Sequence, residues 1–180
     1  EEAEVIVINT CCFIHDAKED SIDSILEMAK YRKNGSCKAL IVTGCMAQRY
    51  RQEILDEIEE VDAVLGTNSF DEILSAIRKA LEGERTLLMK PLSGIPDTGD
   101  ERILTTGGHF AYLKIAEGCG KHCTYCIIPK LRGEYRSVPM ERLLWEAERL
   151  ALQGVKELIL VAQETTLYGA DLYGKKSLHL

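Results

Sequence analysis

Short apolar runs alternate with segments of helical periodicity over the first 82 residues, and this alternation limits the possible folds more than any other feature. Between the runs, apolar residues recur at the three- and four-residue spacing of an amphipathic helix. Buried strands joined by helices are typical of a parallel sheet. We therefore predict a parallel βαβαβα unit over residues 1–82, whose last helix follows a capping box formed by Ser69 and Glu72. The expected strands lie at 5–8, 39–42 and 61–65.

A connection rich in Gly and Pro separates this unit from a second one. Residues 83–108 show no sustained apolar period, as is common between domains. We place a linker at 83–104, between a first domain of 1–82 and a second domain of 105–180. In the second domain we predict strands at 110–116 and 155–162 and a helix at 140–153.

Both ends of the sequence look cut. The chain opens at Glu1, directly before a strand, and it shows no stop signal after Gly174. We expect a fragment of a longer protein, in which the second α/β unit ends before it closes.

The charge balance argues against some classes of partner. With 22 Lys and Arg against 29 Asp and Glu, the formal net charge is −7, which disfavours non-specific binding to nucleic acid or to anionic membranes. No apolar run reaches the roughly 18 residues of a membrane span, and no secretory leader is evident. We therefore expect a cytoplasmic protein without a membrane partner. The segment 119–136 is an exception to this acidic balance, because it is basic. We predict an anion site there among Lys121, Lys130, Arg132 and Arg136.

Three of the seven cysteines are packed into eight residues directly after an expected strand. Sites of α/β folds form at the carboxyl ends of strands. The spacing of Cys119, Cys123 and Cys126 lets one loop hold three corners of a cubane iron–sulfur cluster and leaves the fourth iron open to a ligand. Two alternatives are a zinc site, which usually takes four ligands in paired CxxC units, and a ferredoxin-type electron carrier, whose loop would add a fourth Cys followed by Pro.

This CxxxCxxC pattern, with an aromatic residue before its last Cys, resembles the signature of the radical SAM superfamily. The resemblance implies that Cys119, Cys123 and Cys126 bind a 4Fe-4S cluster whose free iron chelates S-adenosyl-L-methionine. It also implies the start of a (β/α) partial TIM barrel and a reductant of the flavodoxin or ferredoxin type. One-electron cleavage of the sulfonium then yields a radical that abstracts hydrogen from an unactivated carbon.

Three further residues are candidates for binding the same cofactor. Tyr125 is the aromatic residue of the signature, and Gln163 and Glu164 end the expected strand at 155–162. At this edge many radical SAM enzymes bind the amino group of the methionine. A polar strand end without a ligand is the alternative interpretation of Gln163 and Glu164.

Two cysteines of the first unit follow neighbouring strands. Cys11 lies just past the first strand and Cys45 just past the second, so both thiols are expected at the same edge of the parallel sheet. Spacing alone leaves open whether they are ligands, since an unpaired Cys is often simply buried. We interpret Cys12 and Cys37 as packing residues.

The segments around Cys11 and Cys45 resemble the second and third cysteine motifs of the N-terminal domain of methylthiotransferases: Asn9-Thr10-Cys11-Cys12-Phe13-Ile14 and Thr43-Gly44-Cys45-Met46-Ala47-Gln48-Arg49-Tyr50. In that family an earlier Cys, absent from this sequence, completes an auxiliary 4Fe-4S cluster. The resemblance thus implies two clusters, and S-adenosylmethionine used both as radical source and as methyl donor.

The segment 161–174 resembles one branch of this family, which modifies the β-carbon of an aspartate in a small-subunit ribosomal protein. Glu164 stands where that branch usually has Asp, and Val138 where the family commonly has Arg. A tRNA-modifying methylthiotransferase is one alternative, although the net charge argues against a nucleic-acid partner. A non-catalytic zinc or iron–sulfur module is another. The remaining candidates are interpreted as structural: His15, His109, His179 and Trp145.

Overall fold

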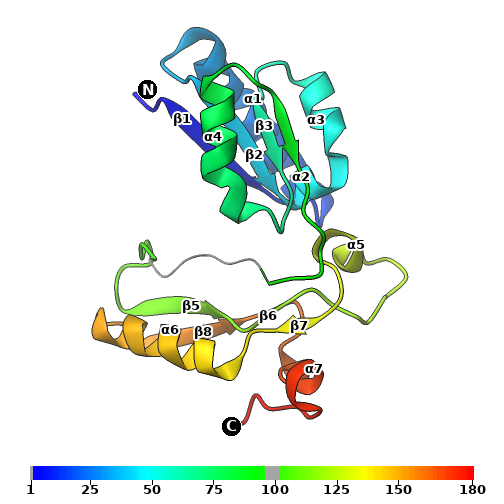
Figure 1. The fold of residues 1–180 in the computed structure, drawn as a ribbon, viewed down its shortest axis with the longest axis vertical. Coiled ribbons are helices and arrows are strands. Elements are labelled where there is room, and N and C mark those ends of the chain that lie inside the picture. Colours follow the sequence, from blue (N-terminus) through cyan, green and yellow to red (C-terminus); the bar gives the residue numbers. More distant parts are fainter. Residues whose placement is uncertain (1, 96–101) are drawn as a thin grey trace. The chain divides into compact units, whose positions relative to one another are not determined.

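The computed structural model describes residues 2–95 and 102–180 (Figure 1). The chain divides into two compact units, Glu1–Leu92 and Ser93–Leu180. Both mix helices with strands, and the first contains the parallel sheet that the apolar runs predicted, so the α/β class is confirmed. None of the described helices is long and apolar enough to cross a membrane.

A four-stranded sheet forms the centre of the first unit. Its strands follow the order β1 (Val5–Thr10), β2 (Ala39–Gly44), β3 (Ala63–Leu65) and β4 (Thr86–Leu88), and every neighbouring pair is parallel. All six residues of β2 are buried, as expected for a continuous apolar run inside a parallel sheet. The register pairs Thr10 with Gly44, so β1 and β2 end side by side.

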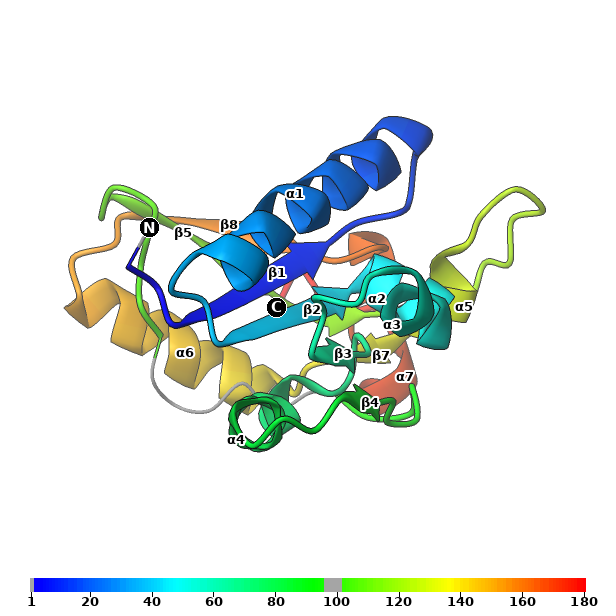
Figure 2. The same cartoon turned by 90° about the horizontal axis from the view of Figure 1, so that it is seen from above.

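The helices of this unit lie on both sides of the sheet (Figure 2). Helix α1 (His15–Asn34) lies along β1 and β2, and α4 (Ile73–Leu81) lies on the opposite side. Ala76 of α4 packs with Ile41 and Leu65 in one buried cluster, which stabilises the unit by removing apolar surface from water. The shorter helices are α2 (Cys45–Tyr50), α3 (Gln52–Glu57) and the 3-10 turn η1 (Phe70–Glu72).

Two local expectations differ from the structure. Strand β4 lies inside the segment predicted as a linker. The sequence did not indicate this strand because the run that forms it is only three residues long and lies among Gly and Pro. The capping box is wrong: no side chain caps η1 or α4. The Ser69 hydroxyl instead accepts a hydrogen bond from the backbone N–H of Lys90, at 3.0 Å.

The described part of the second unit contains two small sheets. Strand β5 (Phe110–Lys114) pairs in parallel with β8 (Glu157–Val161), and β6 (Ala116–Glu117) pairs antiparallel with β7 (Arg136–Ser137). The predicted strand at 110–116 is therefore divided between two sheets at Ile115. The remaining elements are α5 (Ile128–Arg132), α6 (Met140–Leu152), η2 (Thr165–Leu167) and α7 (Ala170–Tyr173). The core gathers Leu113, Ile115, Val138, Leu143 and Tyr168.

Candidate metal centre

One loop between β6 and α5 carries Cys119, Cys123 and Cys126. The Cys119 backbone N–H donates to the Gly133 carbonyl at 3.1 Å, and the Cys126 N–H donates to the Cys123 carbonyl at 2.9 Å. Cys123 is exposed and the other two cysteines are half-buried. The loop thus presents three thiols that a ligand from outside can reach.

The separation of these thiols bears on the kind of metal they suit. Among the described residues, three ligating atoms all lie within 4.8 Å of one another only in the group of His15, Asp16 and Glu19, so at least one pair of loop thiols is farther apart. Two thiolates on one tetrahedral zinc stand about 3.8 Å apart, since each Zn–S bond is about 2.3 Å. Thiolates of a cubane cluster bind different irons and stand farther apart. The three loop thiols would therefore have to move closer together to bind one zinc ion.

Gly118 gives the loop its starting direction. Its φ is +79°, and a Cβ at this position would stand 2.2 Å from the Glu134 carbonyl oxygen and 2.5 Å from that of Gly133. Only glycine fits here, because both the backbone conformation and the close approach exclude a side chain. The loop is thereby held against residues 133 and 134, where Cys119 makes its backbone hydrogen bond.

A buried carboxylate anchors the strand before the loop. Glu117 is 3% exposed, and its carboxylate accepts a hydrogen bond from Gln163 Nε2 at 3.0 Å. Lys114 and Arg132 pair with the same carboxylate, the latter at 3.6 Å. A buried charge is tolerated only when it is paired and hydrogen-bonded, so these three partners keep Glu117 in place.

The candidate cofactor-binding residues after β8 have partners inside the unit. Gln163 Oε1 accepts the Gly118 backbone N–H at 2.9 Å. The Glu164 carboxylate pairs with the Lys121 ammonium and accepts the Thr166 backbone N–H at 3.1 Å. The hydrogen bond from Lys121, followed by that from Thr166, lowers the pKa of Glu164 to about 2. Their role in binding a cofactor stays a prediction.

Tyr125 differs from these two residues in its surroundings. It lies between Cys123 and Cys126 on the loop, and its side chain is 88% exposed. The ring is therefore available to a ligand at the loop, and its contact with the cofactor also stays a prediction.

The basic segment 119–136 is less available to an anion than its charge indicated. Arg136 donates to the carbonyl oxygens of Gly94, Arg132 and Glu134, at 3.1, 3.0 and 2.6 Å, and burial lowers the pKa of its guanidinium. Lys121 and Arg132 are engaged with carboxylates. These bases mainly hold the loop and its neighbours together, which charge counting could not reveal.

In the first unit, Cys11 and Cys45 lie at the same edge of the sheet, as predicted. Cys11 directly follows β1 and Cys45 begins α2, immediately after the paired residues Thr10 and Gly44. Cys11 is exposed and Cys45 is half-buried. The Ser21 hydroxyl fixes the backbone at Cys11, because it accepts the Cys11 N–H and donates to the Cys11 carbonyl, both at 2.9 Å.

Cys12 lies closer to this pair than the sequence indicated. It is buried, as expected of a packing residue. Burial raises the pKa of its thiol and the neighbouring Cys45 adds to this effect, whereas the charge of Arg49 and a hydrogen bond from it oppose it. The edge thus gathers three thiols and one guanidinium, and no pattern in the sequence marked Arg49 as their neighbour.

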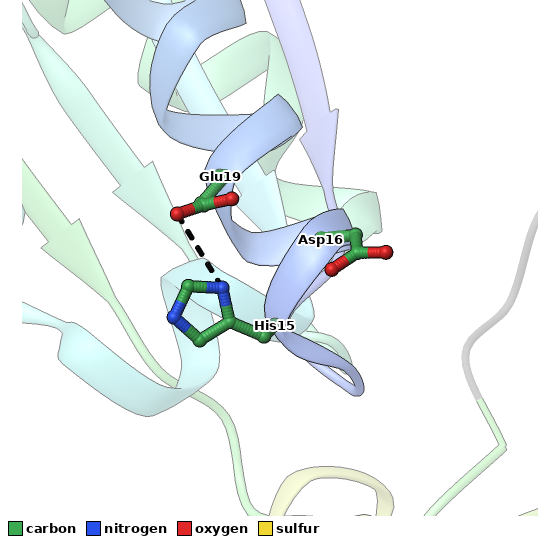
Figure 3. A group of neighbouring side chains, drawn as sticks. All are labelled: His15, Asp16 and Glu19. Atoms are coloured by element: carbon green, nitrogen blue, oxygen red, sulfur yellow. Dashed lines mark ion pairs between the residues drawn. The ribbon is translucent and has the colours of Figure 1, made fainter.

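A separate group of possible ligands lies at the start of α1 (Figure 3). His15 Nδ1 is 3.4 Å from Glu19 Oε1. The two residues are one helical turn apart, and Asp16 stands beside them. All three side chains are exposed, and helical spacing alone brings them together, so the group carries no argument for a bound metal.

Comparison with known proteins gives matches over both units. Residues 1–66 match the uncharacterized protein family UPF0004, and residues 113–178 match the radical SAM superfamily. A protein of Lachnoclostridium phytofermentans named ribosomal protein uS12 methylthiotransferase RimO is 66% identical over 177 residues, which cover 98% of this chain and 40% of that protein. The protein of the same name from Clostridium tetani is 52% identical over 179 residues, covering 99% and 40%. The chain thus spans about two fifths of the relatives it matches.

Proposed function

We propose that the protein containing this chain is a radical SAM methylthiotransferase, which transfers a methylthio group to an unactivated C–H bond of a ribosomal protein. The target we propose is the β-carbon of an aspartate in uS12, the protein in the names of its relatives. We expect an enzyme with such a substrate to act in the cytoplasm.

The single observation that carries this proposal is the loop of Cys119, Cys123 and Cys126, which presents three thiols at the end of β6. These thiols would hold a 4Fe-4S cluster that, when bound, supplies one-electron cleavage of S-adenosylmethionine and hence a hydrogen-abstracting radical. The electron would come from a reductant of the flavodoxin or ferredoxin type. Tyr125 would border the bound cofactor.

A second cluster is the further part of the proposal. Cys11 and Cys45 would supply two of its ligands, since they follow paired ends of β1 and β2. The third thiolate would come from a part of the protein outside this chain. We expect about eight irons per full-length protein after anaerobic reconstitution, if both sites are cubane clusters. About four irons would remove the second cluster from the proposal.

The test of the function is mass spectrometry of uS12 from cells with and without the full-length gene. We expect a methylthio group on one aspartate only where the gene is intact. Complementation with Cys126→Ala should leave uS12 unmodified, whereas Cys37→Ala, a buried cysteine outside both groups, should restore the modification.

Two other results would contradict this function. Unmodified uS12 together with gene-dependent methylthio groups on tRNA would assign the protein to the tRNA-modifying branch. One zinc per chain without iron charge-transfer absorption would indicate a metal-binding module without this activity.

A further inference from the structure

Two consecutive residues after β8 reach the cysteine loop. Gln163 accepts the backbone N–H of Gly118, the residue that opens the loop, at 2.9 Å. Glu164 pairs with Lys121, in the middle of the loop. The loop is thus attached at two points to the segment that follows β8, and these contacts join residues more than forty positions apart in the sequence.

Gln163 uses both ends of its amide. Its Oε1 accepts from Gly118, and its Nε2 donates to the buried carboxylate of Glu117 at 3.0 Å. A side chain that satisfies both groups at once has one orientation available. Flipping the amide would set its NH2 group against the Gly118 N–H and its oxygen against the Glu117 carboxylate. Gln163 therefore fixes the position of the backbone at 117 and 118.

Lys121 stands between two of the three cysteines. Its ammonium pairs with the carboxylate of Glu164. The Glu164 side chain is largely buried and is oriented by Thr166, whose backbone N–H and hydroxyl both donate to it. A carboxylate held in this way limits where Lys121, and with it the middle of the loop, can lie.

We propose that Gln163 and Glu164 are positioning residues, which hold the loop of Cys119, Cys123 and Cys126 in one conformation through Gly118 and Lys121. We call the contacts of Gln163 with Gly118 and of Glu164 with Lys121 the clamp. The identity of the group that the loop binds rests on the proposed function, whereas the clamp does not. In this role the two residues act on the loop through its backbone and the Lys121 ammonium, whichever group the loop binds.

Hydrogen exchange in the metal-free full-length protein tests the clamp directly. In Lys121→Gln and Glu164→Gln we expect the amides of residues 118–126 to exchange about two- to fivefold faster, the range for a partly exposed ion pair. Lys121→Arg and Glu164→Asp keep the charges and should exchange like the wild type. The matched control is Glu146→Gln, which breaks the 2.8 Å ion pair between Arg102 and Glu146 in the same unit.

A double variant separates the ion pair from unrelated effects of each substitution. If Lys121 and Glu164 act through one another, the variant carrying both Gln substitutions should exchange no faster than the quicker single variant. Loop exchange that is unchanged in both single variants, or a double variant in which the two effects simply add, would overturn the proposal.

The reconstituted protein gives a second readout that a general loss of stability would not move. A displaced loop should change the electron paramagnetic resonance spectrum of the reduced cluster in the same sense in both Gln variants. A purely electrostatic effect would instead shift the reduction potential in opposite directions, since one variant removes a positive and the other a negative charge. Opposite shifts with an unaltered spectrum would contradict positioning. A wild type that binds no iron would contradict the proposed function and leave the exchange result standing.

Discussion

Asp171 accepts two hydrogen bonds from Ser137, one from the backbone N–H at 2.8 Å and one from the hydroxyl at 2.6 Å. Ser137 belongs to β7 and is 2% exposed. Burial alone would raise the pKa of Asp171, but the hydrogen bonds from Ser137, together with those from the backbone N–H groups of Asp171 and Leu172, outweigh it and lower the pKa. The aspartate of the sequence Asp171-Leu172-Tyr173-Gly174 thus fastens α7 to β7.

Asp171→Asn should destabilise the second unit. The Asn amide has one oxygen to accept hydrogen bonds, whereas the backbone N–H and the hydroxyl of Ser137 each donate to a separate carboxylate oxygen of Asp171. We therefore expect a loss of about 1.5–3 kcal/mol in the free energy of unfolding, the range for hydrogen bonds to charged groups. Urea unfolding followed through the fluorescence of Trp145, the single Trp of the chain, measures it. Asp16→Asn, an exposed change in the first unit, is the control. A loss below about 0.5 kcal/mol for Asp171→Asn, as at ordinary surface sites, would contradict this role.

Local pattern predicted the elements well and long-range contacts poorly. The strands around residues 5–8 and 39–42 were predictable because each is a continuous apolar run. All of β2 is buried, as such a run indicates, whereas β1 stands at the end of the strand order and leaves Val7 45% exposed. The three residues of β4 were missed, since so short a run shows no period.

For the candidate site, the edge shared by Cys11 and Cys45 followed from strand order. The contacts of Gln163 and Lys121 depend on which loops meet in the folded chain, and spacing carries no information about that. Arg136 shows the same limit. Its charge indicated a ligand site, and only the fold reveals that three carbonyl oxygens occupy its guanidinium.

Tyr168 should make the second unit sensitive to alkaline pH. Its hydroxyl donates to the Val138 carbonyl at 2.9 Å, and burial followed by the charge of Tyr173 raises its pKa to about 12. A raised pKa favours the neutral phenol in the folded state, so its contribution is complete below the unfolded value of about 10 and is lost as pH rises to about 12. We expect a loss on the order of 2 kcal/mol over this range, measured by urea unfolding.

The matched variant for this prediction is Tyr168→Phe, which cannot ionise. Its unfolding free energy should be lower than that of the wild type at pH 9 and should change less between pH 10 and 12. Equal pH dependence in the two proteins would show that Tyr168 is not the group responsible.

Gly118→Ala should displace the cysteine loop. The added Cβ would meet the carbonyl oxygens of Gly133 and Glu134 at 2.5 and 2.2 Å, so the backbone must move. Gly154→Ala is the control, because its φ of +95° carries the same conformational penalty while no atom lies within 4 Å of the added carbon. We expect Gly118→Ala to lose most of the iron of the radical site and Gly154→Ala to keep it. Equal iron contents would contradict the role given to Gly118.

Asp62 should be essential to the sheet of the first unit, although it interrupts an apolar run. It is 7% exposed and accepts the Leu40 backbone N–H at 2.8 Å and the Arg32 guanidinium at 2.8 and 3.0 Å. Asp62→Ala leaves a buried N–H and a cation unpaired, and we expect a loss of about 3–5 kcal/mol in urea unfolding followed by circular dichroism.

Two comparisons check this account of Asp62. Arg32→Lys keeps the charge but not the two-pronged hydrogen bonding, and should cost only about 1 kcal/mol. If Asp62→Ala were as mild as Arg32→Lys, the hydrogen bond to Leu40 would not contribute as described.

The most direct test of the central claim is the formation of 5'-deoxyadenosine by the full-length protein. After anaerobic reconstitution with iron and sulfide, and with dithionite as the electron source, the brown protein should cleave S-adenosylmethionine. Cys123→Ala should abolish this cleavage, whereas Cys37→Ala should retain it. A colourless wild type that leaves the cofactor intact, or a Cys123→Ala variant as active as the wild type, would contradict the assignment of the cysteine loop.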